Sequence, residues 1–407
     1  MVFLELPGFK NISHKEKSMT HSTDFTLPPA LLEQLSEQGL DAIPEMIRIL
    51  INNAMLAERQ RFLNAVPYER TLERTAHSNG FKPKTMLTRQ GQITFEVPQV
   101  REGGFYPQAL EKGLRSERAL KLALAEMYVQ GVSTRKVAAI TQQLCGFEVT
   151  SSQVSAAAAQ LDPLLEEWRN RRLGEIPYVF VDARYEKVRQ DKQVLDVAVL
   201  IASGVDRAGK RQILGVSVAT SEAEVHWRTF FSKLVERGLS GVQLIISDSH
   251  AGLGAARKAV FGGIPWQRCQ FHLQQNAGAY VPKVEMRSEV ATDIRSIFTA
   301  FDRSAAEARL KVVVEKYTQS ASKLARWLEE NIEQGLTVFS FPVQHRRLIR
   351  TTNSLERVNQ EVARRTRVAR IFPNEASLLR LSSAILMEIS EEWENGKTYL
   401  TFETNPA

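Results

Sequence analysis

The feature that most constrains the fold is a change of hydrophobic period near Ile176. Before it, apolar residues recur three and four positions apart, as in an amphipathic helix; after it, short apolar runs of strand length appear. The expected elements are strands at 177–182, 193–202 and 212–219, a helix at 222–237, a strand at 242–247, a helix at 251–261 and a short strand at 264–270. The turn residues of GVDRAGK make the second and third strands a hairpin.

Strand, hairpin, helix, strand, helix, strand is the order of a ribonuclease-H-like α/β core, whose mixed sheet places the first strand beside the fourth. Residues 173–275 and 341–400 would form this core on either side of a helical segment at 276–340. Asp182 ends the first strand, and Asp248 ends the fourth in the stretch LIISDSHAGL. Because α/β sheets place their chemistry at strand ends, we expect these two carboxylates to lie side by side.

Two carboxylates that close together repel each other unless a cation lies between them. Hard oxygen ligands select Mg²⁺, for which Mn²⁺ is a chemical substitute. Two such ions about 4 Å apart activate an attacking oxygen and stabilise a leaving one in phosphoryl transfer. The expected cofactor is therefore a pair of Mg²⁺ ions, and the site needs a third acid.

Glu356 is the best candidate for that acid. It borders an apolar stripe of Leu355, Val358 and Val362 on an expected helix from Thr352 to about residue 367. Residues 344–370 contain eight arginines against two glutamates, a local charge of +6 that suits phosphate binding.

A purely structural role for Glu356 stays open. Asn353 and Asn359 lie three residues on either side of it, on its own helix face. Asn353 and Glu356 also have the spacing of a capping box, in which the glutamate bonds back to the start of the helix. In that case the third acid would be another residue, such as Glu361.

The N-terminal part is expected to be mainly helical. Residues 1–40 are expected to be flexible, 41–115 to form a basic region and 116–172 a helix-turn-helix-like DNA-binding domain. A helical pattern spans 31–66, and QITFEVPQV is typical of a short edge strand because Pro98 cannot donate to a neighbour.

The region 116–172 contains three expected helices, separated at Gly131 and Gly146, with Ser151 or Ser152 capping the third. This arrangement fits a helix-turn-helix module, although a plain helical bundle fits it as well. At the start of the second helix, Arg135 and Lys136 are candidate DNA contacts.

The composition favours a cytoplasmic, nucleoid-associated protein. The 407 residues carry a net charge of +7, which favours a polyanionic partner. No apolar run approaches the roughly 20 residues of a membrane helix, and the N-terminal stretch is too polar for a secretory signal. Two cysteines cannot form a disulfide framework and suit a reducing compartment. We expect no membrane partner.

Several stretches together resemble the Mutator-type transposases of bacterial insertion sequences, a family of DDE recombinases with a ribonuclease-H-like fold. The resemblance covers roughly residues 50–374. It is carried, in this order, by SNGFKPKTMLTRQGQITFEVP, MYVQGVSTRKVAAI, YVFVDARYEKVR, LIISDSHAGL, RCQFHLQQN and RTTNSLERVNQEVARRTRVARIFPN.

The resemblance implies a DDE transposase that binds the terminal inverted repeats of its element and catalyses Mg²⁺-dependent DNA cleavage and strand transfer. The family's catalytic acids fall on Asp182, Asp248 and Glu356, and its Cys-x-x-His pair falls on Cys269 and His272. One Cys and one His cannot complete the four-ligand shell of a structural zinc site. We expect the histidine to lie near the acids and to orient DNA or a carboxylate.

Two other functions stay open: a non-catalytic, element-derived DNA-binding regulator, and a nuclease on the same fold. The presence of all three acids counts against the first, and the N-terminal helices and the insertion count against the second. The expected partners are terminal-repeat and target DNA and, because two element ends must be joined, at least one further copy of the chain. The accessory residues are Cys269, His272 and Asn353, and the expected DNA contacts are Arg135, Lys136, Arg350, Arg357, Arg364 and Arg365.

Overall fold

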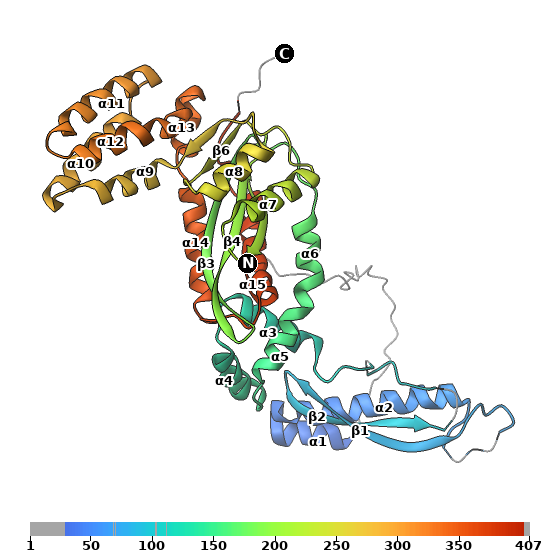
Figure 1. Ribbon diagram of the computed structural model, residues 1–407. Coiled ribbons are helices and arrows are strands. Elements are labelled where there is room, and N and C mark those ends of the chain that lie inside the picture. The colour runs from blue at the N-terminus through green and yellow to red at the C-terminus, as the bar shows by residue number, and fades with distance from the viewer. Residues whose placement is uncertain (1–28, 68, 70, 102–103, 111, 403–407) are drawn as a thin grey trace. The chain divides into compact units, whose positions relative to one another are not determined.

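The computed structural model describes residues 29–67, 69, 71–101, 104–110 and 112–402 (Figure 1). They form two compact units, the first comprising the described residues up to Tyr128 together with Val132–Gln160, and the second Val129–Gly131 together with the chain from Leu161 onward. The division after Gln160 falls earlier than the boundary expected at residue 172. Of the segment 1–40, residues 1–28 lie outside the described residues.

The first unit begins with helices followed by a hairpin. Its elements are α1 (Pro29–Gln38), the 3₁₀ turn η1 (Gly39–Ala42), α2 (Ile43–Leu63), β1 (Ser78–Thr88) and β2 (Gly91–Val100). Residues 29–38 are therefore helical, contrary to the flexibility expected for them. Gly39 adopts a left-handed conformation (φ +59°) that ends α1, so the helical pattern expected over 31–66 is divided in two.

The hairpin contains the expected strand β2 and a partner, β1, that was not expected. Most of β1 is exposed, so its sequence lacks the alternation of a half-buried strand. The strand forms because it pairs antiparallel with β2, and the pairing begins next to the turn, where Thr88 lies opposite Gly91. On β2, Ile93 and Phe95 pack with Met55 of α2, which anchors the pair.

Three helices complete the first unit: α3 (Arg118–Val129), α4 (Thr134–Cys145) and α5 (Ser151–Ala158). Leu124, Val137 and Val154, one from each helix, share a core. The third helix is capped by Thr150, which forms a capping box with Gln153, and not by Ser151 or Ser152 as expected. The third helix expected in 116–172 breaks after α5. Its second half is a separate helix, α6 (Asp162–Asn170), which belongs to the second unit.

A five-stranded mixed sheet is the centre of the second unit. Its strands are β3 (Tyr178–Gln190), β4 (Gln193–Val205), β5 (Arg211–Ala219), β6 (Leu244–Ser247) and β7 (Trp266–Arg268), in the order β5-β4-β3-β6-β7. Strand β4 is antiparallel to both of its neighbours, β3 and β5, whereas β6 and β7 run parallel to β3.

Strand β3 is longer than expected, so Asp182 lies in its middle and not at its end. The strand continues because β4 pairs with it along its whole length, to the tight turn at Asp191 and Lys192, both with positive φ. On its other side β3 pairs with β6 at only three positions, the last at Phe180. Asp182 therefore lies just beyond the last residue of β3 that pairs with β6.

Helices cover both faces of this sheet. On one face, Val179 and Val181 of β3 pack with Trp227 and Phe231 of α7 (Glu224–Glu236), and with α8 (Ala251–Val260). Side chains alternate along a strand, so Asp182 lies on the opposite face. That face carries α14 (Asn353–Thr366), which contacts β3, and α15 (Glu375–Asn395), which contacts β5 and α6. The long helix α15 was not expected from the sequence.

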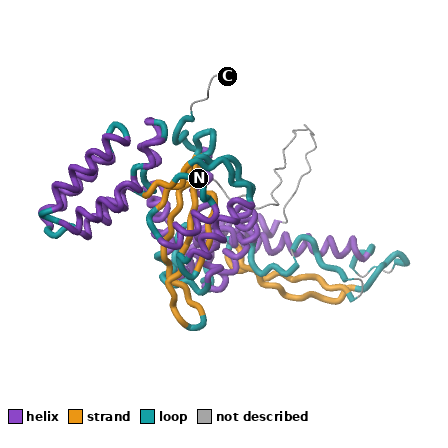
Figure 2. Tube along the Cα trace, turned by 45° about the horizontal axis from the view of Figure 1, so that its top comes forward, coloured by secondary structure: helices purple, strands orange, loops and turns teal. Residues whose placement is uncertain are grey.

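The segment 276–340 is helical as expected. After α9 (Gln270–Ala277), its elements are η3 (Gly278–Tyr280), η4 (Val284–Met286), α10 (Arg287–Phe298), α11 (Arg303–Thr318), α12 (Ser322–Asn331), η5 (Ile332–Gly335) and η6 (Thr337–Ser340), followed by α13 (Val343–Ile349). Figures 1 and 2 show α10–α12 extending to one side of the sheet. Within the described part of the chain, none of the helices has the length and apolar character needed to cross a membrane.

Candidate active site

Three acids that are far apart in the sequence come from adjacent elements of the second unit. Asp182 is on β3, Asp248 follows β6 directly, and Glu356 lies in the first turn of α14. Phe180 pairs with Ile246, so two further residues along each parallel strand bring Asp182 level with Asp248. Asp182 experiences repulsion from both of the other carboxylates, which indicates that the three acids form one cluster.

Asp182 is held at both carboxylate oxygens. Oδ1 accepts a hydrogen bond from the Ala183 backbone N–H (2.9 Å), and Oδ2 accepts one from Nδ2 of Asn359 on α14 (2.8 Å). Burial raises the pKa of Asp182 to about 6, and repulsion from Asp248 and Glu356 adds to the effect. Such a carboxylate is stabilised in its ionised form by a nearby cation.

Asp248 lies in a short loop whose shape is fixed by hydrogen bonds. The Ser249 backbone N–H donates to Asp248 Oδ1 (2.7 Å). The buried hydroxyl of Ser247 donates to the Asp248 carbonyl (2.8 Å) and accepts from Nε1 of Trp266 (2.9 Å). These contacts join the end of β6 to β7, so the Asp248 carboxylate has a defined position before α8 begins.

Helix α14 presents Glu356 to the cluster. The expected apolar stripe is present, because Leu355, Val358 and Val362 are all buried. The Glu356 side chain is 25% exposed, and its Oε1 atom has no hydrogen-bond partner among the described residues. One carboxylate oxygen is thus free to bind a ligand.

The capping-box reading of Glu356 is wrong. Helix α14 has Thr352 at its N-cap, with no hydrogen bond from a capping side chain, and Asn353 is already its first residue. Asn353 is exposed, whereas Asn359, on the other side of Glu356, binds Asp182. The residue that supports the acids is therefore Asn359, and not the Asn353 selected from the sequence.

Cys269 and His272 lie beside the acids. The buried Cys269 Sγ accepts hydrogen bonds from the backbone N–H and the hydroxyl of Thr352 (both 3.3 Å). His272 Nε2 is 3.7 Å from Glu356 Oε1. Burial acts to raise the pKa of Cys269, but the imidazole of His272 beside the sulfur and the hydrogen bonds from Thr352 outweigh it and lower the pKa. The nearby Cys269 sulfur, followed by the aspartates, raises the pKa of His272 to about 9.

Comparison with known sequences identifies the family. A sequence model described as "Transposase, Mutator family" matches residues 20–396, a wider span than the resemblance in the motifs. The chain belongs to this family. It is 58% identical to the transposase of insertion sequence element IS406 from Burkholderia multivorans over 370 residues, which cover 90% of this chain and 95% of the relative. It is 38% identical to the IS256 transposase in transposon Tn4001 from Staphylococcus aureus (93% and 98% covered). It is 37% identical to the IS1081 transposase of Mycobacterium tuberculosis (95% and 93% covered).

The expected DNA-binding arginines of this Mutator-family chain have different environments. Arg357 is exposed and Arg350 is half-buried. Arg364 is exposed but forms two hydrogen bonds with Glu361 (both 2.7 Å).

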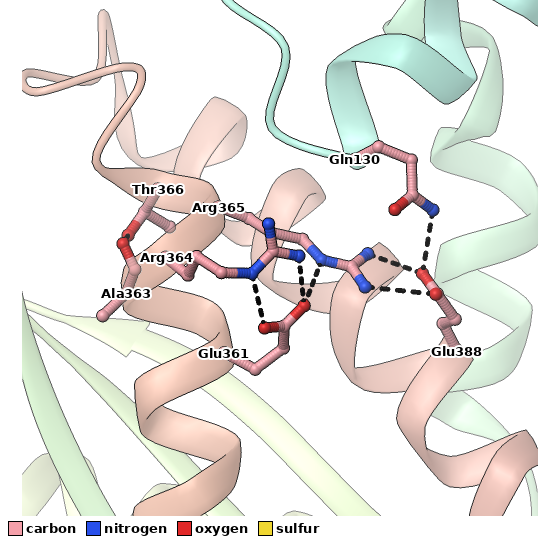
Figure 3. A network of polar contacts seen from close by, with 7 residues as sticks. All are labelled: Gln130, Glu361, Ala363, Arg364, Arg365, Thr366 and Glu388. Atoms are coloured by element: carbon pink, nitrogen blue, oxygen red, sulfur yellow. Dashed lines mark hydrogen bonds and ion pairs between the residues drawn. The ribbon is translucent and has the colours of Figure 1, made fainter.

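Arg365 does not fit the role of a DNA contact. Only 6% of the residue is exposed, because its guanidinium binds Glu361 (2.7 Å) and both oxygens of Glu388 on α15 (2.6 and 3.1 Å) (Figure 3). Its positive charge is already neutralised within the protein, so it joins α14 to α15. The basic run in the sequence groups Arg365 with the expected phosphate-binding arginines, because its partner Glu388 lies 23 residues further along the chain.

Arg184 is a basic residue near the acids that the sequence did not single out. It lies two residues after Asp182, on the same face of β3. Its Nε donates to Glu186 (3.0 Å), and its Nη1 donates to the backbone carbonyl of Asn359. Arg184 therefore holds α14 against β3. The period of the strand was the available signal, but the strand was expected to end at Asp182.

In the first unit, Arg135 and Lys136 lie at the start of α4 and are both exposed. The hydroxyl of Ser133 caps this helix by accepting from the Lys136 backbone N–H (3.2 Å). The two side chains are thus available to a ligand, and their contact with DNA stays a prediction.

Proposed function

We propose that this Mutator-family protein is a DDE transposase with a ribonuclease-H-like core, which binds the terminal inverted repeats of its element and cuts and joins DNA strands at Asp182, Asp248 and Glu356. The observation that carries the proposal is the convergence of these acids from β3, β6 and α14. The names of the relatives, all transposases of insertion sequences, agree with it.

The topology of the second unit supports the ribonuclease-H-like assignment. Three antiparallel strands are followed by two parallel strands, and the first strand lies in the middle of the sheet beside the fourth. Helices α7 and α8 cover one face, and α14 lies on the face that carries Asp182. This is the arrangement that the order of elements in the sequence predicts.

The donor set fits Mg²⁺ or Mn²⁺. Asp182, Asp248 and Glu356 would hold the ions through carboxylate oxygens, which are the ligands that hard divalent cations select. Glu356 Oε1 has no hydrogen-bond partner among the described residues, and the pKa of Asp182 is raised; both observations fit acids that would take a cation as ligand. A bound pair of ions would supply charge stabilisation for the attacking and leaving oxygens of a DNA phosphate.

The remaining residues position these acids. Asn359 and the Ala183 N–H fix the orientation of the Asp182 carboxylate, and the Ser249 N–H does the same for Asp248. His272, with a pKa near 9, carries a positive charge beside Glu356 at neutral pH. That charge reduces the repulsion among the acids and attracts a DNA phosphate. Hydrolysis of one strand at the element end would leave a 3′-hydroxyl. This hydroxyl would then attack a phosphate of the target strand, and the bond from that phosphate to the target's own 3′-oxygen would break.

The first unit would recognise the element ends. Helices α3, α4 and α5 pack around one core and leave Arg135 and Lys136 exposed at the start of α4. A short capped helix that presents basic side chains at its N-terminal turn is the arrangement used for major-groove contacts. Joining two ends requires at least two copies of the chain on DNA.

The proposal is tested with purified full-length protein, Mg²⁺ and a labelled DNA duplex that carries one element end. We expect a free 3′-hydroxyl at the element boundary and joining of that end to a second duplex, both abolished by chelation of the metal. Specific end binding without cleavage in Mg²⁺ or Mn²⁺ would favour a DNA-binding regulator. Cleavage that ignores the element end and yields no joined product would favour a nuclease.

A further inference from the structure

The closest group of metal-binding side chains is not the set of three acids. One ligand atom each from Cys269, His272 and Glu356 lies within 4.8 Å of the other two. Across the ranges that the structure describes, no other set of three Cys, His, Asp or Glu side chains meets this spacing, and the trio Asp182, Asp248 and Glu356 does not. The geometry therefore favours a different kind of ion from the one that the acids would hold.

The chemistry of this trio is that of a borderline-soft divalent cation. Thiolate and imidazole are ligands of Zn²⁺, whereas Mg²⁺ prefers oxygen. Three protein ligands leave the fourth tetrahedral position to water or substrate, as in a non-structural zinc site. Binding of the ion would release the proton of His272, because only a neutral imidazole is a ligand. The thiolate and the carboxylate then carry a charge of −2, which would balance one Zn²⁺ in this partly buried position.

Two polar atoms of the trio lack the partners that buried groups normally have. His272 Nδ1 and Glu356 Oε1 are both buried and make no hydrogen bond to any described residue. An unsatisfied buried polar atom carries a free-energy penalty, and an ion at the site is one physical reason for it to persist.

Cys269 is already arranged as a ligand. The N–H and hydroxyl of Thr352 both donate to its Sγ, and such donors stabilise a thiolate and fix its direction. Cys269 is fully buried, while His272 and Glu356 are 21% and 25% exposed. The sulfur thus forms the closed side of the cluster, and an ion would enter past the other two side chains.

We propose that Cys269, His272 and Glu356 form a second, softer metal site that binds Zn²⁺, and that its occupation inhibits DNA cleavage by withdrawing Glu356 from the acid cluster. Metal binding depends on these three residues alone. Inhibition rests in addition on the proposed transposase function, because only a Glu356 that serves cleavage can be withdrawn from it.

Binding is tested on metal-depleted full-length protein with Co²⁺ as the probe, because a cobalt–thiolate bond gives a charge-transfer absorption band. We expect one equivalent of Co²⁺ to produce this band, and Zn²⁺ but not excess Mg²⁺ to remove it. Cys269→Ser should abolish the band, whereas the matched control Cys145→Ser, in the first unit, should retain it. A folded wild-type protein without the band, or a band that survives Cys269→Ser, would overturn the site.

Because Cys269 is fully buried, its replacement can impair folding, and His272→Gln provides an independent test at a partly exposed position. We expect His272→Gln to keep the circular dichroism of the wild type and to weaken Co²⁺ binding by about tenfold or more, as the loss of one ligand requires. Unchanged Co²⁺ affinity in this folded variant would also overturn the site.

The inhibitory part is tested by adding Zn²⁺ to Mg²⁺-dependent cleavage of an element end. We expect Zn²⁺ to stop cleavage by the wild type over the range in which it displaces Co²⁺. Cleavage that continues with the site filled would show that the ion does not withdraw Glu356. A protein that binds Co²⁺ through Cys269 but cleaves no DNA under any condition would instead contradict the proposed function and leave the metal site standing.

Discussion

Helix α14 carries two glutamates in opposite surroundings, although they are only five positions apart. Glu361 binds the guanidinium groups of Arg364 and Arg365, and hydrogen bonds from Arg364 lead the effects that lower its pKa to about 2. Glu356 has an oxygen with no hydrogen-bond partner among the described residues. Its neighbour in space, Asp182, has a pKa raised by burial to about 6.

The difference separates a charge that is paired within the protein from one that is incompletely paired, on the same helix. Around Glu361, each negative charge is matched by an arginine, and Arg365 extends the network to Glu388 on α15 (Figure 3). Around Glu356, three acids share one region with His272 as a nearby cation. A charge paired within the protein holds the fold together, while an incompletely paired acid cluster is stable only with help from a ligand.

The largest expected effect comes from removing charge from the incompletely paired cluster of Asp182, Asp248 and Glu356. Asp182→Asn and Asp248→Asn each keep the side-chain shape but remove a negative charge needed to hold a divalent ion. We expect each to lower the rate of strand cleavage by at least roughly 100-fold, since metal ions supply several kcal/mol of transition-state stabilisation. The measurement is 3′-hydroxyl formation on a labelled element end, with end binding measured in parallel.

Asp206→Asn is the matched control for these two variants. Asp206 lies in the β4–β5 turn, where Oδ1 accepts from the Lys210 backbone N–H (2.8 Å), a bond that asparagine can preserve. It should cleave at nearly the wild-type rate. Normal cleavage by Asp182→Asn or Asp248→Asn would remove that residue from the catalytic set.

The comparison on α14 is sharpened by making the same substitution at both glutamates. Glu356→Gln should fold and bind element ends but fail to cleave or join them. Glu361→Gln should remain active but lose roughly 1–2 kcal/mol of stability, because its charge-assisted bonds to Arg364 and Arg365 weaken. Cleavage assays and urea unfolding measure the two effects, and active Glu356→Gln protein would show that the unpaired oxygen has no catalytic role.

Asp182 and Glu361 predict opposite dependences of stability on pH in metal-free protein. The folded-state pKa of Asp182 is raised from 3.8 to about 6, so the folded state binds the proton more tightly and stability should fall as pH rises through this range. The pKa of Glu361 is lowered from 4.5 to about 2, so its contribution should be lost as pH falls through that range. Each effect is on the order of 1–3 kcal/mol.

These slopes are measured by urea unfolding with a chelator present. Asp182→Asn should flatten the wild-type dependence between pH 3.8 and about 6, and Glu361→Gln should flatten it below pH 4.5. An unchanged dependence above pH 4.5 in Asp182→Asn would mean that the carboxylate is not destabilised by its surroundings.

The smallest expected effect distinguishes an exposed arginine of α14 from a buried one. Arg357→Gln should weaken DNA binding and reduce the slope of log affinity against log salt by about 0.9, the value for one lost phosphate contact. Arg365→Gln should lower stability through the broken bonds to Glu361 and Glu388 without changing that slope. Equal slopes for Arg357→Gln and wild type would exclude Arg357 from the DNA interface.

Local patterns in the sequence predicted much of the architecture. The strands β3 to β7, the helices α7, α8 and α14, and the helical segment before α13 follow from hydrophobic period and turn residues. Helix α15 and strand β1 were missed. β1 is mostly exposed and forms through its pairing with β2, a partner interaction that leaves little periodic signal in β1 itself.

The candidate site was predictable where residue type and strand position carried the signal. Asp182, Asp248 and Glu356 were chosen because strand order and an apolar helix stripe place acids at one edge of a sheet. The choice of Asn353 over Asn359 was wrong because it depended on where α14 begins, and element boundaries are the least reliable part of a sequence-based prediction.

By itself, the sequence determined which elements form, in what order, and which acids they carry, because hydrophobic period and chain order are properties of the covalent chain. Tertiary structure alone decided which charges meet partners from distant segments. Arg365 and Arg357 belong to the same basic run, but one meets Glu388 on a helix that begins after residue 374 and the other is exposed. Glu361 meets Arg364 and Arg365 three and four residues along its own helix, a spacing that the sequence already contains. The surroundings of Glu356 come instead from β3 and from the residues around Cys269 and His272, so packing between distant segments sets its Coulomb energy.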